Sequence, residues 1–374
     1  MAQTEGMTRR IVQVMASEPP DVERHVRDVS AQLAADGWAV MTVAPPGADV
    51  VGDPRVRYVP ANLTDRVAAG DAGLLRTVRH VARGADVVHA HGLRAGTAAV
   101  AAVRSLRGCR PAVVVTVHQM PTGSAVAQGV SGVAERTVAR GADLCLGVSS
   151  DLVERLRDRG ARRTGTALVA APDRPTPVRS PAEVRAALRV ADGTLVVLTV
   201  ARLASGQGLS LLVDAAAALF DRARPDRFRW LVAGDGPLHD DVDIQIALTG
   251  APVTLLGARA DTADLLATCD VFCSTSPWEG RPLVVAQALA LGAPVVATDV
   301  GGTGEVTGEA AVLVPYGDAD LLAQALAGLL DSPEERQARS QASVAQAAHL
   351  PTPDDVVAHL TEAYATLPVR ADRT

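Results

Sequence analysis

The sequence contains no lysine: all 36 basic residues among its 374 residues are arginines. This absence excludes sites built on a lysine side chain, namely the P-loop phosphate site, the kinase ATP site and the pyridoxal Schiff base. Long apolar runs are also missing, since a run such as Pro111–Val117 is far shorter than the roughly 18 residues that span a membrane. The apolar stretch Ile11–Ala16 is too short for a secretory signal and favours a buried first strand.

Cysteines are few and show no metal-binding or disulfide pattern. The four are Cys109, Cys145, Cys269 and Cys273. No Cys-x-x-Cys pair occurs, and no histidine lies near them at metal-ligand spacing. We therefore expect four reduced thiols in the core of a cytosolic protein.

Charge is shared unevenly between the two halves of the chain. Residues 1–180 contain 23 arginines and 17 acidic residues, a net charge of +6, whereas residues 181–374 contain 13 and 25, a net charge of −12. The asymmetry predicts two lobes with different partners, although codon bias with chance is an alternative. The first lobe would then meet an anionic partner or membrane surface, with Arg76, Arg79 and Arg83 around one helix.

The length fits two domains, and the hydrophobic content of 48% excludes disordered and low-complexity classes. Short apolar strands alternate with amphipathic helical segments, which predicts βαβ units and parallel sheets. The strands expected in the first half are Ile11–Met15, Ala39–Ala44, Val87–His89, Val113–Val117 and Leu144–Val148. Those expected in the second half are Leu195–Val200, Trp230–Ala233, Val253–Leu255, Val271–Ser274 and Val295–Ala297.

A stretch rich in proline, arginine and threonine, Ala171–Pro181, interrupts this alternation and predicts a linker. We expect an α/β protein with two Rossmann-like, doubly wound domains, residues 1–180 and 181–350, facing across a cleft. A last helix, about Asp354–Thr366, belongs to the segment 351–374. The Asp-x-Asp pairs at Asp241 and Asp318 fall at predicted helix starts, where capping is favoured over a metal site.

The segment Ser274–Gln287 leads from a strand through a loop into a helix. Pro282 suits the first helical position, so the free N–H groups of Leu283 and Val284 would form an anion site suited to a phosphate. Glu279 lies beside that site, where it could hold a sugar hydroxyl. The alternative is a carboxylate that only caps the helix.

Charged or polar residues also end three other apolar strands. Arg202 follows the strand Leu195–Val200 and could clamp a phosphate, or else form an ion pair between the lobes. His118 ends one first-half strand, and His89 and His91 end its neighbour. His118 is the stronger candidate to bind a sugar or act on a hydroxyl, whereas a structural role is the alternative for all three histidines.

These segments, in this order, resemble the retaining family-four glycosyltransferases of the GT-B fold over nearly the whole chain. The most specific runs lie between Thr199 and Gly302: Val-Ala-Arg-Leu, Ala-Gly-Asp-Gly-Pro, Glu-Gly-Arg-Pro-Leu-Val-Val and Pro-Val-Val-Ala-Thr-Asp-Val-Gly-Gly. The resemblance implies transfer of a sugar from a nucleoside-diphosphate sugar with retained anomeric configuration. It also implies no metal or other cofactor, a donor bound by the second lobe, an acceptor bound by the first, and a last helix that crosses back onto the first lobe.

By the same resemblance, His118 and Glu279 are the catalytic residues. The donor-binding residues would be Arg202, Gln207, Gly280, Arg281, Leu283, Val284 and Gln287. The acceptor stays open, whether anionic or membrane-associated, and no nucleic-acid partner is expected. We expect a cytoplasmic protein, peripheral to the inner membrane face if the acceptor is there.

Three positions depart from the family pattern. Gln207 stands where the family has a lysine, Gln287 replaces its second glutamate, and Pro20-Asp21 replaces its first-lobe glycine pair. Each charge-assisted phosphate bond contributes roughly 1.5–3 kcal/mol, so loss of the lysine would weaken donor binding about tenfold to a hundredfold. Two functions therefore remain open: an active transferase with an altered donor site, and a weak or inactive relative that acts as a scaffold. A sugar-nucleotide epimerase is disfavoured, because no cluster of carboxylates surrounds Glu279.

Overall fold

The computed structural model describes residues 8–61, 71–121, 125–222 and 227–368. The chain forms two units, one made of the residues up to Ala170 with those from Pro351 onward, and the other of Ala171–Leu350. The second unit thus begins at the start of the expected linker, not after residue 180. The reason is that the backbone N–H of Val178 donates to the Asp264 carboxylate at 2.6 Å, which ties the linker to the second unit.

Unit 1 contains a seven-stranded sheet in the order β3-β2-β1-β4-β5-β6-β7. Every neighbouring pair is parallel. The strands are β1 (Arg10–Met15), β2 (Ala39–Ala44), β3 (Arg57–Pro60), β4 (Val87–His91), β5 (Ala112–Val117), β6 (Leu144–Gly147) and β7 (Thr164–Thr166). Because β1 lies between β2 and β4, the chain changes direction across the sheet there, and sheets of this kind bind ligands at the carboxyl ends of the strands flanking that point.

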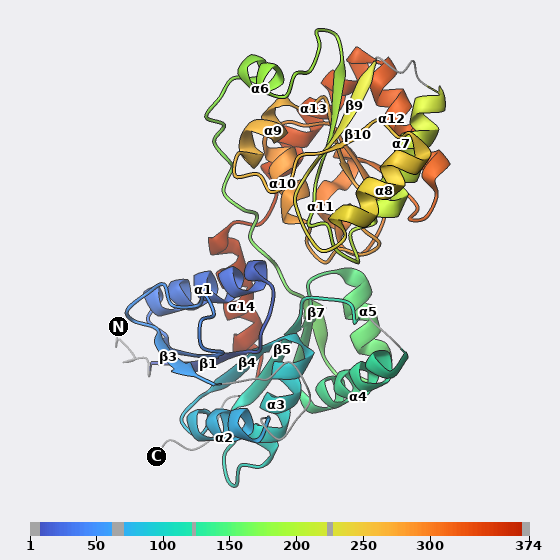
Figure 1. Cartoon of the computed structure of the whole chain (residues 1–374). Coiled ribbons are helices and arrows are strands. Elements are labelled where there is room, and N and C mark those ends of the chain that lie inside the picture. Colours follow the sequence, from blue (N-terminus) through green and yellow to red (C-terminus); the bar gives the residue numbers. More distant parts are fainter. Residues whose placement is uncertain (1–7, 62–70, 122–124, 223–226, 369–374) are drawn as a thin grey trace. The chain divides into compact units, whose positions relative to one another are not determined.

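Helices cover both faces of this sheet. They are α1 (Pro20–Ala35), α2 (Asp71–Ala82), α3 (Gly92–Arg104), α4 (Ala125–Gly141), α5 (Ser150–Asp158) and α14 (Pro353–Ala365). The first and last of these, α1 and α14, pack side by side on one face, whereas α2 and α3 cover the other (Figure 1). The segment after Pro351 therefore completes the hydrophobic cover of unit 1.

Unit 2 contains a six-stranded parallel sheet in the order β10-β9-β8-β11-β12-β13. Its strands are β8 (Leu195–Val200), β9 (Phe228–Ala233), β10 (Val253–Leu255), β11 (Val271–Ser274), β12 (Val295–Thr298) and β13 (Val312–Val314). Its helices are α6 (Pro181–Ala187), α7 (Leu209–Arg222), α8 (His239–Thr249), α9 (Thr262–Thr268), α10 (Leu283–Ala290), α11 (Thr303–Thr307), α12 (Ala319–Asp331) and α13 (Pro333–Ala347). The change of chain direction falls between β8 and β11.

The alternation of side chains along β8 builds two cores in unit 2. Val197 packs with α7 and α12 on one face, whereas Val196 and Leu198 pack with α9 and α10 on the other. A strand buried on both faces has a continuous apolar sequence, which is why the sequence revealed it. The two parallel α/β sheets confirm the expected fold class.

Several sequence expectations need correction. Cys109 is exposed and not a core residue, although all four cysteines are free thiols. Pro282 is the N-cap of α10, with φ −72° and ψ 92°, and Leu283 is the first helical residue. Short strands such as β3 and β7 escaped prediction because their side chains are exposed or only half-buried. Asp318 is confirmed as an N-cap, since its carboxylate accepts from the backbone N–H of Leu321 at 2.9 Å.

Candidate functional site

The carboxyl ends of β8, β11 and β12 bring the second-lobe candidates to one edge of the unit 2 sheet. Arg202 lies two residues after β8 and is exposed. Its guanidinium makes no ion pair or hydrogen bond with any residue that the structure describes. An arginine held at a strand end without an internal partner can bind an external phosphate in bidentate fashion.

Glu279 is anchored through both its side chain and its backbone. The Ser276 hydroxyl donates to Glu279 Oε1 at 2.8 Å, and the Gly302 N–H donates to the Glu279 carbonyl at 2.8 Å. Gly301 has φ +53°, and a Cβ there would lie 2.0 Å from the Glu279 carbonyl oxygen. The loop after β12 thus fixes the position of the loop that carries Glu279.

The start of α10 supplies backbone donors beside this loop. No side chain caps the helix, and its first turn contains no acidic residue. The N–H groups of Leu283 and Val284 have no carbonyl four residues earlier within the helix, so they are available to an anion. Gly280 is buried just before the helix, and Gln287 lies half-buried one turn into it.

Two other candidates are held by contacts within unit 2. The Arg281 guanidinium pairs with Glu305 at 3.1 Å and is 12% exposed. Burial lowers the pKa of Arg281, while Glu305 opposes that shift. The backbone carbonyl of Gln207 accepts from Thr275 Oγ1 at 3.1 Å, which ties the loop after β8 to the residue that follows β11.

In unit 1, a chain of buried hydrogen bonds runs along one face of the sheet. His91 Nε2 lies 2.9 Å from Gln13 Oε1, and His91 Nδ1 lies 3.1 Å from His118 Nε2. Because Gln13 Oε1 can only accept, His91 Nε2 donates and His91 Nδ1 accepts from His118. Successive side chains of a strand alternate between faces, so the parallel register of β1, β4 and β5 places these groups together.

His89 belongs to a second branch that includes the last helix. His89 Nδ1 lies 2.6 Å from the Tyr364 hydroxyl, and His89 Nε2 lies 2.7 Å from Thr116 Oγ1. His25, from α1, completes the cluster, with its ring centroid 5.8 Å from that of His91 and 5.5 Å from that of His118.

Burial keeps these four imidazoles neutral. It lowers the pKa of His25 to about 4, with a smaller contribution from Arg24, and lowers that of His89 to about 3. The pKa values of His91 and His118 also lie well below the ordinary value, for the same reason. A neutral His118 can donate or accept a hydrogen bond but carries no charge.

A carboxyl group lies at the same edge. Burial, followed by the charges of Asp21 and Glu23, raises the pKa of Glu18 to about 7. Gly92, with φ +81°, gives the carboxyl room, since a Cβ there would lie 2.2 Å from Glu18 Oε1. Sequence reasoning missed both Glu18 and His25. Glu18 follows the first strand, and His25 lies in the first turns of the next helix. These positions at the carboxyl edge of the sheet could have marked both residues as site candidates.

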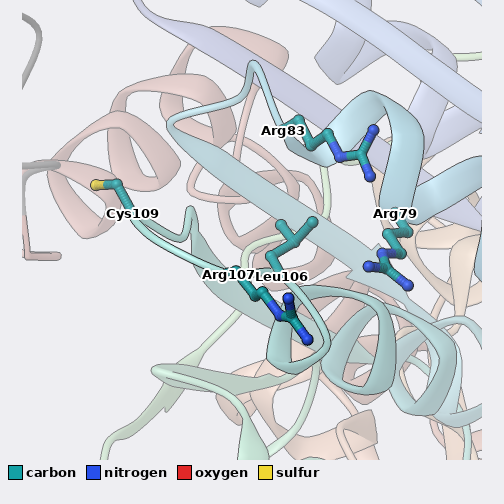
Figure 2. Close-up of a pocket in the computed structure, with 5 residues that line it drawn as sticks. All are labelled: Arg79, Arg83, Leu106, Arg107 and Cys109. Atoms are coloured by element: carbon teal, nitrogen blue, oxygen red, sulfur yellow. The ribbon is translucent and has the colours of Figure 1, made fainter.

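Unit 1 also has a hollow of about 350 Å³ lined by Arg79, Arg83, Leu106, Arg107 and Cys109 (Figure 2). The three guanidinium groups gather around the Leu106 side chain, and the described lining contains no acidic residue. The lining residues come from the end of α2 and the segment after α3. These segments precede β4 and β5, so the hollow lies at the opposite edge of the sheet from His91 and His118.

Two family models match the chain, one in each unit. The model "Glycosyltransferase Family 4" matches residues 22–169, and the model "Glycosyl transferases group 1" matches residues 194–332. The chain belongs to the group 1 glycosyltransferases of the GT-B fold. Together the two matches include His118, Arg202 and Glu279.

Named relatives of this glycosyltransferase are distant. An alpha-D-kanosaminyltransferase of Streptomyces kanamyceticus is 30% identical over 152 residues, 39% of each chain. A D-inositol 3-phosphate glycosyltransferase of Kineococcus radiotolerans is 29% identical over 84% of this chain and 83% of its own length. The chain thus matches well under half of the first relative and most of the second.

Solved structures agree on the fold. The Anabaena HepE protein, crystallised with UDP-glucose, superposes with a TM-score of 0.76 at 21% identity, covering 96% of this chain and 100% of that one. Among the described residues of the glycosyltransferase, no helix is both long and apolar enough to cross a membrane.

Proposed function

We propose that the protein transfers a hexosyl group from a nucleoside-diphosphate sugar to an acceptor with retention of anomeric configuration and without a metal at the diphosphate. The observation that carries this proposal is the grouping of Arg202, Glu279 and the uncapped start of α10 at the carboxyl ends of β8 and β11. Family membership supports transfer chemistry, and the UDP-glucose complex of the HepE protein supports a nucleotide-sugar donor.

Donor binding rests on groups that complement negative charge. Arg202 and the amides of Leu283 and Val284 bind the diphosphate, while Gly280 lets the backbone approach it. As the bond between the anomeric carbon and the diphosphate oxygen breaks, negative charge grows on the leaving group. The arginine and the helix start stabilise that charge without reorganisation.

Glu279 accepts hydrogen bonds from hydroxyls of the donor sugar, and its anchoring by Ser276 limits its motion. Arg281 supports the loop through its pair with Glu305. His118 contributes a neutral hydrogen-bonding group to the sugar from unit 1. Gln207 and Gln287 bind phosphate and ribose hydroxyls as neutral amides, more weakly than charged groups would.

Unit 1 binds the acceptor in this proposal, and the acceptor is anionic or lies at an anionic membrane surface. The support for an anionic acceptor is the net charge of +6 over residues 1–180. The hollow lined by Arg79, Arg83 and Arg107 lies at the opposite edge of the sheet from His118, so it supports attachment to an anionic surface and not acceptor binding beside His118. A cytoplasmic protein that attaches peripherally would use such a surface, and attachment would weaken as salt screens the charges. Relatives named for lipopolysaccharide core biosynthesis agree with a role in making bacterial glycoconjugates.

The deciding experiment is a donor screen by thermal shift across UDP-, GDP- and ADP-sugars, followed by assay of hydrolysis or transfer. Arg202→Ala should abolish the stabilisation given by the best donor, whereas Arg229→Ala, which removes an exposed arginine of β9, should leave it unchanged. Glu279→Ala should abolish turnover.

An unchanged response to donor in Arg202→Ala would place the diphosphate elsewhere. No turnover with any donor, together with full complementation in cells by the Glu279→Ala, His118→Ala double variant, would overturn the enzymatic function in favour of a scaffold.

A further inference from the structure

Three imidazoles from three different elements converge in unit 1. They belong to His25 of α1, His91 at the end of β4, and His118 immediately after β5. One ring nitrogen of each lies within 4.8 Å of the corresponding nitrogen of the other two. All three side chains are buried, with exposed fractions of 9%, 0% and 7%.

The nitrogen geometry suits coordination to one ion. His91 Nδ1 and His118 Nε2 are 3.1 Å apart. Two imidazole nitrogens bound to one tetrahedral ion at about 2.0–2.1 Å would be separated by roughly 3.3 Å. The His91–His118 pair therefore stands close to ligand spacing, and a ring nitrogen of His25 lies within 4.8 Å of both.

A supporting residue already orients one ring. Gln13 Oε1 accepts from His91 Nε2 at 2.9 Å, which leaves the His91 Nδ1 lone pair directed toward His118. A hydrogen bond from the distal ring nitrogen to an oxygen is the usual support of a metal-bound histidine. The ring of His118 can ligate through Nε2 once its proton moves to Nδ1, and buried imidazoles favour the neutral form that binds metals.

We propose that His25, His91 and His118 form a binding site for one divalent transition-metal ion of the zinc, cobalt or nickel type. Three imidazoles without a carboxylate select such ions over Mg²⁺ and Ca²⁺, which prefer oxygen ligands. All three residues belong to unit 1.

The consequence for activity rests on the proposed function. An ion bound at this site would regulate transfer. Binding of the ion would take His118 Nε2 away from the sugar and fix the orientation of the ring. Transfer would therefore slow, and a chelator would restore it.

The test uses the tag-free full-length chain stripped of metal with EDTA. Titration with Co²⁺, followed by its visible absorption, should show one equivalent bound in a tetrahedral environment, and equilibrium dialysis should show one Zn²⁺. His25→Gln and His91→Gln should each weaken binding more than a hundredfold. Gln13→Leu should weaken it about 10–100-fold, as expected for loss of a supporting residue.

Two controls separate the site from non-specific binding. His359→Gln removes a half-buried histidine of unit 1 whose Nε2 donates to the Thr166 carbonyl, and His349→Gln removes an exposed histidine of unit 2. Both should retain one equivalent of Co²⁺. Circular dichroism checks that each variant is folded.

Absence of Co²⁺ and Zn²⁺ binding by the folded wild-type chain would overturn the proposal. Binding that survives both His25→Gln and His91→Gln would also overturn it. Since these measurements use no sugar donor, their outcome is independent of whether the protein proves to be a transferase.

Discussion

Gly301 lies so close to Glu279 that a Cβ on the glycine would come within 2.0 Å of the glutamate's backbone carbonyl oxygen. The two residues follow different strands, Glu279 coming after β11 and Gly301 after β12. The proposed sugar-binding carboxylate therefore depends for its position on a glycine that need not touch the ligand.

Gly301→Ala should accordingly displace the Glu279 loop. We expect it to lower the free energy of unfolding by about 1–3 kcal/mol beyond the left-handed backbone penalty, and to weaken donor binding. Gly250→Ala is the matched control, because Gly250 has φ +66° and a Cβ added there would have no heavy atom within 4 Å. Thermal unfolding and donor titration measure both effects. Equal destabilisation in the two variants would mean that the contact with Glu279 is easily relieved.

Gln207→Lys should tighten binding of the nucleoside diphosphate about tenfold to a hundredfold. A lysine ammonium would add a charge-assisted bond where the glutamine offers a neutral amide. Gln337→Lys adds the same charge on exposed α13 and should leave affinity unchanged. Isothermal titration with the best diphosphate gives the comparison. A similar gain in both variants would show only a long-range effect of charge.

The stability of unit 1 should fall in acid because of its four buried histidines. The pKa values of His25 and His89 in the folded state, about 4 and about 3, lie below the ordinary 6.5. Between those values and pH 6.5, the unfolded chain binds more protons, so stability declines as pH falls. Each such histidine lowers the free energy of unfolding by up to about 1.4 kcal/mol for each unit that the pH falls.

His89→Gln should make that decline shallower, whereas substitution of exposed His349 should not. Calorimetric melts of the full chain across this pH range provide the measurement. An acid slope that is unchanged by His89→Gln would contradict the assignment.

Glu18 should act in the opposite sense. Its pKa in the folded state is raised from 4.5 to about 7, so the native chain binds the additional proton between these values and loses stability as pH rises through them. Glu18→Gln should remove this loss. The change that it makes in the free energy of unfolding should be about 2–3 kcal/mol more stabilising above pH 7 than in mild acid. Glu154→Gln, at an exposed position in α5, is the control. A gain that does not depend on pH would point to a cause other than titration.

The pattern of apolar residues was enough to predict the parallel α/β architecture and the positions of the unit 2 candidates. Strands buried on both faces, such as β8 and β11, appear as continuous apolar runs. Arg202 and Glu279 could be found because a charged residue just past such a run must lie at the carboxyl edge of the sheet. The roles of these residues in donor binding remain predictions.

The groups that surround His91 and His118 come from distant parts of the chain and could be identified only from the folded structure. His89 and Tyr364 are 275 residues apart in the chain, yet their side chains are 2.6 Å apart. Residue spacing along a strand shows that His89 and His91 share a face, but it does not show which helix covers that face. Strand order and the return of α14 to unit 1 determine which helices cover that face. Local patterns therefore could not assign Tyr364, Gln13 and His25 to the surroundings of these histidines. The raised pKa of Glu18 has the same origin, because burial depends on packing between elements that are distant in the sequence.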